Sequence, residues 1–324
     1  AGLIMDGRIK DGLSFRVQAA VRQRGGVVSL DRRNRMLVGG AHEILIAVNI
    51  GTSAKGRDPA RECGALRAPA ISWDALVREH RREHRRHYGS MKLTIPGKVP
   101  AEPTDERIAA YQRGTEDNGL PLLYFNYGRY LLCAASAHGE LPPNLQGKWN
   151  EDLHPPWECD LHLDVNLQMN YWPAETAGLQ AYTDALFTFM ESFVPHGRKA
   201  ARDLYGCRGI WFPIQTDPWG RATPESCRWA VWIGSAPWLA QHLWWHYEFG
   251  QDRKFLKKRC YPFLKEVAAF YEDYLVKDAG GTYQIVPSQS PENRFKGGGD
   301  FPVPLCVSSA MDVMLARDLL SHVL

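Results

Sequence analysis

Residues 120–136, LPLLYFNYGRYLLCAAS, decide the fold class. The stretch is strongly apolar, and its apolar residues recur at the spacing of an α-helix. Similar segments follow at residues 167–179, 185–205, 236–249 and 254–276, with a sixth at 307–324. Helices with apolar faces that alternate with aromatic-rich loops predict a helical barrel built from helix pairs, with a site at the loop end. These segments are too few for a complete ring of twelve helices.

The sequence before residue 100 has a different pattern of apolar and polar residues. Residues 13–50 alternate β-branched and polar residues between glycine pairs, which predicts strand–turn–strand units of an antiparallel sheet or sandwich. Residues 73–88 predict a linker helix, and residues 91–98 (MKLTIPGK) predict a last short strand. The proline-bearing run that follows marks a domain boundary near residue 100, and a helix is expected to start at residues 104–106.

Composition excludes several classes of protein. The chain has 324 residues, of which 44% are hydrophobic, and a formal net charge of +3. Its clustered basic residues, 78–86, alternate with Glu and His and accompany no nucleic-acid-binding motif, so a solvated helix face is expected. No apolar run approaches the roughly 18 residues that cross a bilayer. We therefore expect neither a nucleic-acid nor a membrane partner.

The two ends of the chain and its cysteines add further expectations. The first residues do not form a signal peptide, but the chain begins without Met inside an apparent strand, so an upstream leader or domain is expected and the compartment stays open.

The seven Cys are scattered, odd in number and contain no CxxC pair, which argues against a zinc site or a disulfide framework. No metal or cofactor is expected, and most of these thiols should be small buried residues.

Residues 141–172, LPPNLQGKWNEDLHPPWECDLHLDVNLQMNYW, indicate the kind of ligand. The stretch holds three Trp, two His, four Asn and several acidic residues. Amide, imidazole and carboxylate groups beside flat aromatic faces suit a sugar, whose ring has hydroxyls at its rim and apolar C–H patches on its faces. A core would not tolerate so many polar groups without partners, so the stretch is expected to line a polar cleft. Trp149, Trp157 and Asn170 are candidate sugar contacts.

The run HLDVN places three polar groups at alternating positions. His162, Asp164 and Asn166 would point to one side if the backbone is extended, which would gather imidazole, carboxylate and amide over one pocket. The alternative is that Asp164 or Asn166 caps the helix that starts near residue 167.

Two further loops carry candidate residues. In residues 215–220, QTDPWG, Asp217 is either a ligand of a sugar hydroxyl or a turn former, and Trp219 is a candidate stacking face. In residues 287–295, PSQSPENRF, Glu292 is either a solvated charge or a general acid whose carboxyl is held neutral by burial.

The chain resembles glycoside hydrolase family 95, the inverting α-L-fucosidases. The resemblance is carried by NLQGKWN, PPWECDLHLDVNLQMNYWPAE, YGCRGIWF, TDPWG, WWHYEFGQDRKFL, CYPFLKEVAAFY and PSQSPENRF, in order along the chain from about residue 12. In that family a β-sandwich domain precedes an (α/α)6 barrel. The resemblance implies a mainly α chain, with a partial (α/α)6 helical barrel at 100–324 preceded by the remnant of an antiparallel β-sandwich domain at 1–99.

The resemblance also implies roles for individual residues. Glu292 matches the general acid, and Asp164 and Asn166 match a pair that holds the attacking water. That pair is two asparagines in some members, so Asp164 leaves open whether the carboxylate also takes the proton. His162 matches a position beside C6 of the sugar and favours L-fucose over L-galactose. The implied substrate is a fucosylated oligosaccharide or glycan, and the implied location is secreted, periplasmic or at the cell surface.

One part of the family's machinery does not occur in the sequence. The resemblance implies a general base in a motif of the type QIDGNFG, and these 324 residues contain no such motif. We therefore expect a fragment with little hydrolytic activity of its own. Two alternatives stay open, namely a non-catalytic sugar-binding remnant, supported by the ten of eleven Trp between Trp149 and Trp245, and an α-L-galactosidase of the same family.

Overall fold

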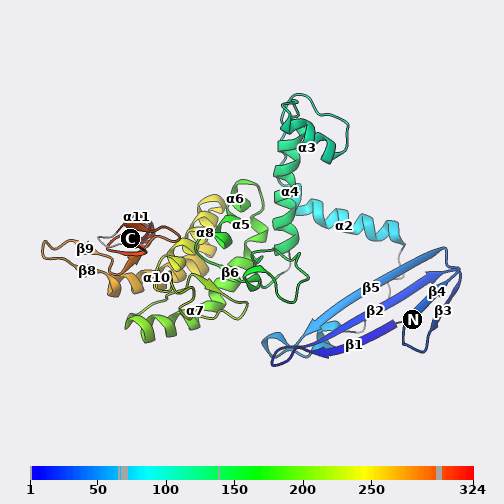
Figure 1. Cartoon of the computed structure of the whole chain (residues 1–324), viewed down its shortest axis with the longest axis horizontal. Helices are drawn as coiled ribbons and strands as arrows, with labels where there is room; N and C mark the ends of the chain where they lie inside the picture. The colour runs from blue at the N-terminus through cyan, green and yellow to red at the C-terminus, as the bar shows by residue number, and fades with distance from the viewer. Residues whose placement is uncertain (1, 65, 67–71, 138, 297–300) are drawn as a thin grey trace. The chain divides into compact units, whose positions relative to one another are not determined.

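Figure 1 shows the computed structural model, which describes residues 2–64, 66, 72–137, 139–296 and 301–324. By its internal contacts the chain divides into two compact units, Ala1–His84 and Arg85–Leu324. The division falls inside helix α2 (Trp73–Tyr88), whose helical structure confirms that expectation for residues 73–88. Because the division cuts a helix and not a linker, it does not decide the domain boundary near residue 100, which stays a prediction.

The first unit is built on a three-stranded antiparallel sheet. Its strands are β1 (Gly2–Arg8), β2 (Ser14–Arg24) and β5 (Glu43–Thr52), in the order β1-β2-β5, and β3 (Val27–Leu30) pairs with β4 (Met36–Gly39) as a separate hairpin (Figure 1). Gly25 and Gly26 join β2 to β3 with positive φ, where a Cβ on Gly26 would lie 2.2 Å from the Gly39 carbonyl oxygen. The strand–turn–strand prediction is therefore confirmed.

One face of this sheet is apolar and uncovered within the unit. Ile44, Ile46, Val48 and Ile50 alternate along β5 and are all exposed. The opposite face carries helix α1 (Pro59–Cys63), whose Cys63 thiol contacts the Arg16 carbonyl. Since the described residues form one sheet layer and a hairpin, the β-sandwich stays a prediction.

The strand expected at residues 91–98 is not formed. This segment has no regular secondary structure, and side chains take its carbonyl groups. Asn118 Nδ2 donates to the Pro96 carbonyl and Arg129 Nη1 to the Met91 carbonyl, while the Asn118 amide donates to Lys98 O. Among the described residues no strand pairs with this segment, so it forms no sheet.

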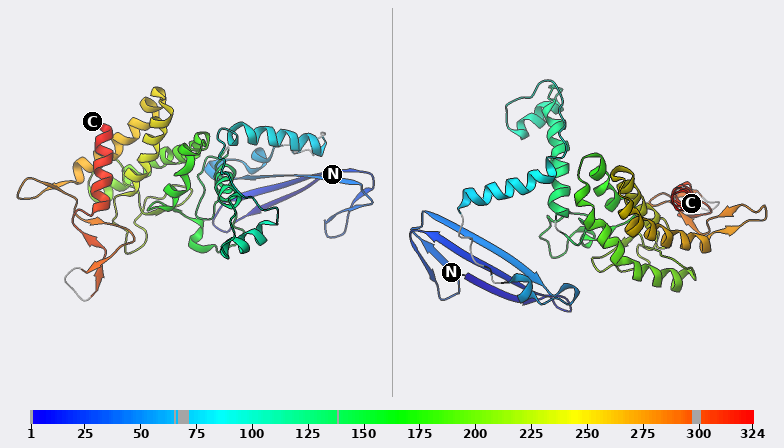
Figure 2. Two further views of the ribbon diagram at one scale, coloured as in Figure 1. Left: turned by 90° about the horizontal axis from the view of Figure 1, so that it is seen from above. Right: turned by 180° about the vertical axis from the view of Figure 1, so that it is seen from behind.

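The second unit is mainly helical. Its helices are α3 (Thr104–Gln112), α4 (Gly119–Ser136), α5 (Asn166–Tyr171), α6 (Pro173–Thr176), α7 (Asp184–Tyr205), α8 (Ser235–Gly250), α9 (Arg253–Phe255), α10 (Tyr261–Tyr274) and α11 (Ala310–Val323). Helix α8 packs against α5, α6, α10 and α11, and α10 also contacts α7 (Figures 1 and 2). This arrangement is consistent with a helical barrel, and each predicted apolar segment from residue 120 onward contains a helix.

Two of the predicted helices are interrupted. The segment 167–179 is divided at Pro173, which lacks the N–H that would continue α5 and instead begins α6. The segment 254–276 contains a π-helical turn, Leu256–Cys260, between α9 and α10, and it ends at Tyr274.

The core of the second unit is aromatic. Phe193 and Phe212 stack with ring centroids 4.1 Å apart, and Phe187, Phe270 and Tyr271 are fully buried around them. Such rings contribute large apolar areas to folding and fix the geometry of the helices that carry them.

Short strand pairs close the loops between these helices. They are β6 (Leu161–His162) with β7 (Gln215–Thr216), β8 (Val276–Lys277) with β9 (Tyr283–Gln284), β10 (Ser288–Gln289) with β13 (Leu305–Cys306), and β11 (Phe295–Lys296) with β12 (Pro302–Val303).

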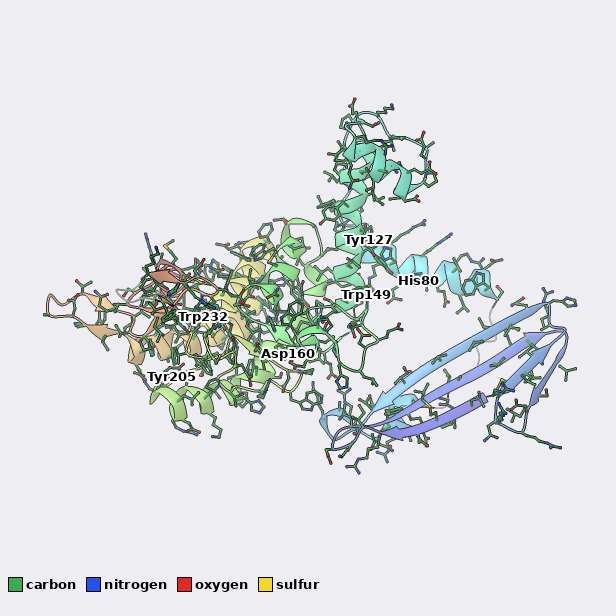
Figure 3. All side chains as sticks on the ribbon, viewed as in Figure 1. His80, Tyr127, Trp149, Asp160, Tyr205 and Trp232 are labelled. Atoms are coloured by element: carbon green, nitrogen blue, oxygen red, sulfur yellow. The ribbon has the colours of Figure 1, made fainter. Side chains whose placement is uncertain are left out.

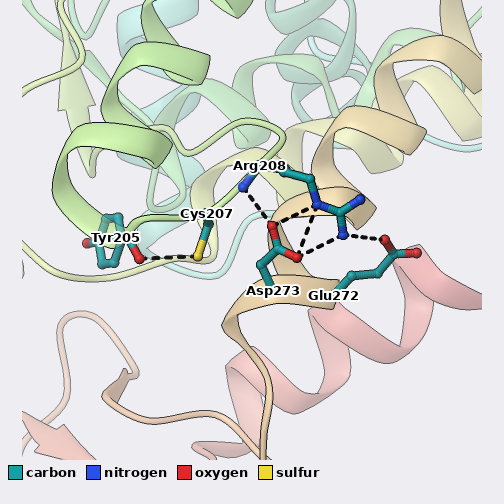
Figure 4. A network of polar contacts seen from close by, with 5 residues as sticks. All are labelled: Tyr205, Cys207, Arg208, Glu272 and Asp273. Atoms are coloured by element: carbon teal, nitrogen blue, oxygen red, sulfur yellow. Dashed lines mark hydrogen bonds and ion pairs between the residues drawn. The ribbon is translucent and has the colours of Figure 1, made fainter.

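An ion-pair network joins Arg208, three residues beyond the end of α7, to the last turn of α10. Arg208 Nε and Nη2 donate to the two carboxylate oxygens of Asp273 at 2.9 and 2.8 Å, and Nη2 also donates to Glu272 at 3.1 Å (Figure 4). The Arg208 amide adds a further bond to Asp273, at 2.8 Å. The guanidinium hydrogen bonds lower the pKa of Asp273 below its usual range.

All seven cysteines are free thiols, four of them buried, as predicted. Among the described residues no helix is both long and apolar enough to cross a membrane.

Candidate functional site

The pairing of β6 with β7 brings two of the predicted loops together. Leu161 lies opposite Thr216 and His162 opposite Gln215, and the Leu163 amide extends the pairing to the Ile214 carbonyl at 2.6 Å. Leu161, Leu163 and Thr216 are buried, so the polar residues between them are held at a fixed place on the edge of the core. The pairing therefore places the residues around His162 directly beside the residues around Gln215.

His162 and Asp160 lie at the start of this region. The His162 side chain is half-buried. Asp160, labelled in Figure 3, lies on the loop that leads into β6. It is only 7% exposed. Burial raises the pKa of Asp160, and the charges of Arg221 and His162 partly oppose that rise. Asp160 is thus a buried carboxyl beside the histidine that sequence reasoning singled out.

Asp164 lies in a turn and Asn166 is the first residue of α5, so neither lies on an extended strand. The extended backbone ends at His162, a turn covers residues 163–165, and α5 begins at Asn166. The expected alternation of three side chains is therefore wrong, because buried Leu163 and Leu167 draw the backbone into a turn against the core. The capping alternative is also wrong, since Val165 is the N-cap residue and no side chain caps this helix.

The electrostatics of Asp164 connect it to Glu292. Asp164 is half-buried, and burial is the main cause that raises the pKa of its carboxyl. The negative charge of Glu292 raises it further, while the charge of His162 and the backbone N–H groups of Asp164 and Val165 lower it. Three residues that the sequence placed in one site therefore act on each other in the folded chain.

Asn170 lies one turn further along α5, where it is half-buried and donates from Nδ2 to the Pro143 carbonyl at 3.5 Å. Gln168, fully buried beside it, donates to the Leu163 carbonyl at 2.7 Å and closes the turn that carries Asp164. The amide of Gln168 thus fixes the turn.

Glu292 lies in the loop that follows β10. Its side chain is exposed, so the expectation that burial would keep this carboxyl neutral is wrong for these residues. The loop itself is anchored, because Ser288 and Gln289 are buried and the Asn293 amide donates to the Ser290 carbonyl at 2.8 Å.

Asp217 stabilises its own loop. Its Oδ1 accepts from the amides of Trp219 and Arg221 at 2.9 and 3.2 Å, and its Oδ2 lies 3.4 Å from Arg221 Nε. These contacts favour the turn-former interpretation of Asp217. Trp219 is left 57% exposed at the tip of the turn.

Trp149 and Trp157 also present their rings to solvent. They are 55% and 69% exposed, on the loop between α4 and β6. Trp157, Glu158 and Cys159 are consecutive residues with φ of 50°, 52° and 53°, a left-handed run that is costly for residues other than Gly. No described contact joins these two rings to the turn that carries Asp164.

No group of three or more His, Cys, Asp or Glu side chains among the described residues could hold a metal ion.

Comparison with known proteins identifies the family. Residues 72–324 match the model of the glycosyl hydrolase family 95 catalytic domain. The chain belongs to glycosyl hydrolase family 95. It is 34% identical over 278 residues to Alpha-L-fucosidase 2 of Arabidopsis thaliana, and 34% identical over 251 residues to Probable alpha-fucosidase A of Aspergillus niger.

These family 95 relatives are much longer than the chain. The two matches cover 82% and 74% of this chain but only 33% and 32% of the relatives. The chain thus spans about a third of the curated relatives that it matches. A solved structure described as a putative kojibiose phosphorylase from human microbiome aligns with a TM-score of 0.66 at 12% identity, covering 99% of this chain and 41% of the other. At that identity the alignment supports the fold alone.

Two residues of this family 95 region escaped sequence reasoning. Asp160 lies inside the polar stretch 141–172 but was not distinguished from its acidic neighbours, because burial is not visible in a loop sequence. Asp312 has no exposed surface and binds the loop that carries Glu292, at 2.6 Å from Ser288 Oγ. Its signal was present as Ser309-x-x-Asp312, the spacing of a helix N-terminal capping box.

Proposed function

We propose that these residues carry the acid and the water-binding groups of an inverting α-L-fucosidase, which hydrolyses terminal α-linked L-fucose from oligosaccharides. Membership of family 95 and the α-fucosidase relatives support glycoside hydrolysis in general. The specific proposal is supported by the effect of the Glu292 charge, which contributes to the raised pKa of Asp164 although the two residues come from loops far apart in the sequence. Hydrolysis with inversion uses two groups of this kind on opposite sides of the anomeric carbon.

The proposed reaction assigns one step to each side of the sugar. Glu292 gives its proton to the glycosidic oxygen as the bond from that oxygen to the anomeric carbon breaks. A water held by Asp164 and Asn166 attacks the same carbon from the opposite face, which inverts its configuration. The proton that this water loses goes to Asp164 or to the general base that the resemblance implies. Glu292 is exposed in the free chain, so in this proposal its carboxyl is free to approach the glycosidic oxygen of a bound oligosaccharide.

Asp164 has the environment of a proton acceptor as well as of a water ligand. Its pKa is raised by burial and by Glu292, and a carboxylate with a higher pKa is a better base near neutral pH. Asp164→Asn separates the two roles. If the carboxylate only orients the water, the amide keeps most of the rate, as the two-asparagine pairs of the family imply. If it takes the proton, the rate falls on the order of 10²–10⁴-fold.

Sugar recognition is proposed for the remaining candidate residues. His162, half-buried on β6, is proposed to contact the C6 end of L-fucose, and Asn170 to contribute an amide. The exposed rings of Trp149, Trp157 and Trp219 are proposed as stacking faces for fucose or for the rest of the glycan. The proposed partner is therefore a fucosylated oligosaccharide.

We propose that the 324 residues on their own turn over slowly. The Asp of a QIDGNFG-type motif, which the resemblance implies as general base, does not occur in them. Absence of a general base lowers the rate on the order of 10²–10⁴-fold. A family 95 chain that binds fucose without hydrolysing it is the second candidate, favoured by the exposed Trp side chains.

Proton NMR of a reaction with a 2′-fucosylated oligosaccharide tests these assignments together. We expect slow release of fucose that first appears as the β-anomer, and complete loss of release in Glu292→Gln. First appearance of the α-anomer would contradict inversion, and unchanged release in Glu292→Gln would contradict the acid. Turnover at the rate of an intact glycosidase would contradict the slow-chain proposal, whereas saturable fucose binding without any release would support the second candidate.

A further inference from the structure

Asp312 is a buried carboxylate on the first turn of α11 whose side chain binds two other parts of the second unit. Its Oδ2 accepts from Ser288 Oγ at 2.6 Å and from the Gln289 amide at 3.2 Å. Its Oδ1 accepts from Trp232 Nε1 at 2.9 Å. The residue has no exposed surface, so these bonds form without competition from water.

The start of α11 is arranged to leave Asp312 free for these contacts. Ser309 is the N-cap residue, and its Oγ accepts from the Asp312 amide at 3.2 Å. In a capping box the acidic side chain three residues later would bind the N-cap amide. Here Ser288 Oγ accepts from the Ser309 amide at 2.9 Å, and Ser309 Oγ donates to the Gln289 carbonyl at 2.8 Å. Strand β10 therefore takes the place of the capping partner.

Through the hydrogen bond between its Oδ1 and Trp232, Asp312 is also connected to the part of the site that contains Asp164. Trp232 packs in a buried cluster with Ile214 and Leu315. The carbonyl of Ile214 accepts from the Leu163 amide at 2.6 Å, and Leu163 directly precedes Asp164. A short path of buried contacts therefore runs from the Asp164 turn through Ile214 and Trp232 to Asp312.

Glu292 has no such support of its own. Its side chain makes no hydrogen bond or ion pair with the described residues, and it lies three residues after Gln289. The backbone of β10 therefore decides where this carboxyl lies. We propose that Asp312 is a positioning residue, which fastens the Glu292 loop to the same buried cluster that carries the Asp164 turn. This inference rests on the proposed function for the role of Glu292 and adds the residue that holds the acid in place.

A carboxylate is required at this position for a geometric reason. Two fixed N–H donors, Trp232 Nε1 and the Gln289 amide, approach two different oxygens of Asp312. Asparagine has one oxygen and one NH₂ group, so one of the two N–H donors would face another donor. Asp312→Asn therefore removes either the hydrogen bond from Trp232 Nε1 or the one from the Gln289 amide, while it keeps the size of the side chain.

Hydrogen exchange followed by mass spectrometry tests the fastening without any sugar. Asp312→Asn is compared with Asp318→Asn, which removes another carboxylate of α11, one that accepts from Gln241 Nε2 at 3.0 Å and does not contact the loop. We expect exchange in residues 286–296 to rise about tenfold or more in Asp312→Asn only, while α10 stays protected. Unchanged exchange in 286–296, or an equal rise throughout the unit, would overturn the proposal.

The titration of Asp164, followed by carboxyl carbon NMR, supplies a readout that a purely structural role would not move. The charged side chains that shift this pKa are His162 and Glu292. If Asp312 holds Glu292 in place, Asp312→Asn lowers the pKa of Asp164 as Glu292→Gln does, and Asp318→Asn leaves it unchanged. A pKa of Asp164 that stays at the wild-type value in Asp312→Asn would overturn the proposal.

A milder variant serves if Asp312→Asn does not fold. Ser288→Ala removes one hydroxyl from the Asp312 carboxylate, and we expect the same local rise in exchange at 286–296 to a smaller extent; no rise would overturn the proposal. Neither measurement requires hydrolysis. If neither measurement gives the expected result, the positioning role of Asp312 is wrong and the proposed function is unaffected. If the wild-type chain does not bind a fucoside, the proposed function is wrong. The loop measurements then still decide whether Asp312 holds the loop.

Discussion

The Glu292 carboxylate acts on Asp164 across the candidate site, where its negative charge adds to the larger effect of burial and raises the pKa of the Asp164 carboxyl. The two residues come from the loop after β10 and from the turn before α5. Their interaction provides a probe of the site that needs neither substrate nor turnover.

Replacing Glu292 by Gln should lower the pKa of Asp164, because the variant removes a negative charge and keeps the volume of the side chain. Carboxyl carbon chemical shifts followed between pH 3 and 8 report the change. Asp160 is the internal control, since its pKa is shifted by burial and by Arg221, His162, Glu158 and Asp217 but not by Glu292. An Asp164 titration that does not move would show that the two carboxyls do not face each other.

The histidine in β6 should determine which sugar is preferred. We expect His162→Thr to change the ratio of the dissociation constants for L-fucose and L-galactose by about tenfold in favour of L-galactose, because the two sugars differ by one hydroxyl at C6. Calorimetric titration with each sugar measures this ratio. Gln215→Thr alters the residue paired with His162 across the two strands and should leave the ratio as it is. An equal change in both variants would mean that the histidine does not contact C6.

A buried histidine makes the stability of the second unit depend on pH. His242 on α8 is 4% exposed, its Nε2 has no hydrogen-bond partner among the described residues, and burial lowers its pKa to about 3. The unfolded chain binds a proton at this residue below about pH 6.5, and the folded chain only below about pH 3, so stability is lost as pH falls between these values.

His242→Phe should remove that dependence. The ring of Phe suits a site bounded by Tyr171 and Trp245, and the free energy of unfolding of the wild type should fall relative to the variant by roughly 1.4 kcal/mol per pH unit below 6.5. Urea unfolding at pH 7, 5.5 and 4.5 measures the difference. His154→Phe, at an exposed loop position, should follow the wild type. Parallel curves for wild type and His242→Phe would contradict the assignment.

The Arg208 network should stabilise the second unit in a salt-dependent manner. Arg208→Gln removes a bidentate pair with Asp273, and we expect a melting temperature a few degrees lower at low ionic strength. Because the groups are exposed, added salt should reduce this difference. Since the pKa of Asp273 is lowered in the folded chain, the stabilisation is present above the usual Asp pKa and is lost as pH falls through the lowered value. Arg202→Gln, which removes only a bond to neighbouring Asp203, is the control. A difference that is independent of salt would contradict the ionic origin.

Much of this fold was predictable because it depends on periodicity. The apolar segments from residue 120 onward all contain helices, and the alternating residues before residue 52 form antiparallel strands. The errors have local physical causes. Pro173 divides a predicted helix because it lacks an N–H, and residues 91–98 contact the side chains of Asn118 and Arg129 through two of their carbonyl groups and pair with no described strand.

The candidate site residues stay a prediction from the sequence, and the contacts that hold them are visible only in the folded chain. The type and spacing of His162, Asp164, Asn166 and Glu292 drew attention to them, and the family resemblance gave them roles. The positions of these side chains in the folded chain depend on burial and on long-range hydrogen bonds. From the sequence, Asp312 is recognisable only as an acidic residue near the start of a helix. The folded chain shows that it binds both β10 and Trp232. A sequence pattern contains no information on which buried donors will meet a carboxylate 80 residues from Trp232.

The central claim is that this chain recognises a terminal α-linked L-fucose. Calorimetric titration of the 324-residue chain with 2′-fucosyllactose, and with lactose as the matched sugar that lacks only the fucose, tests it most directly. We predict saturable binding of one 2′-fucosyllactose per chain, weakened in His162→Thr, and no measurable binding of lactose. Equal binding of the two sugars, or binding of neither, would contradict the account.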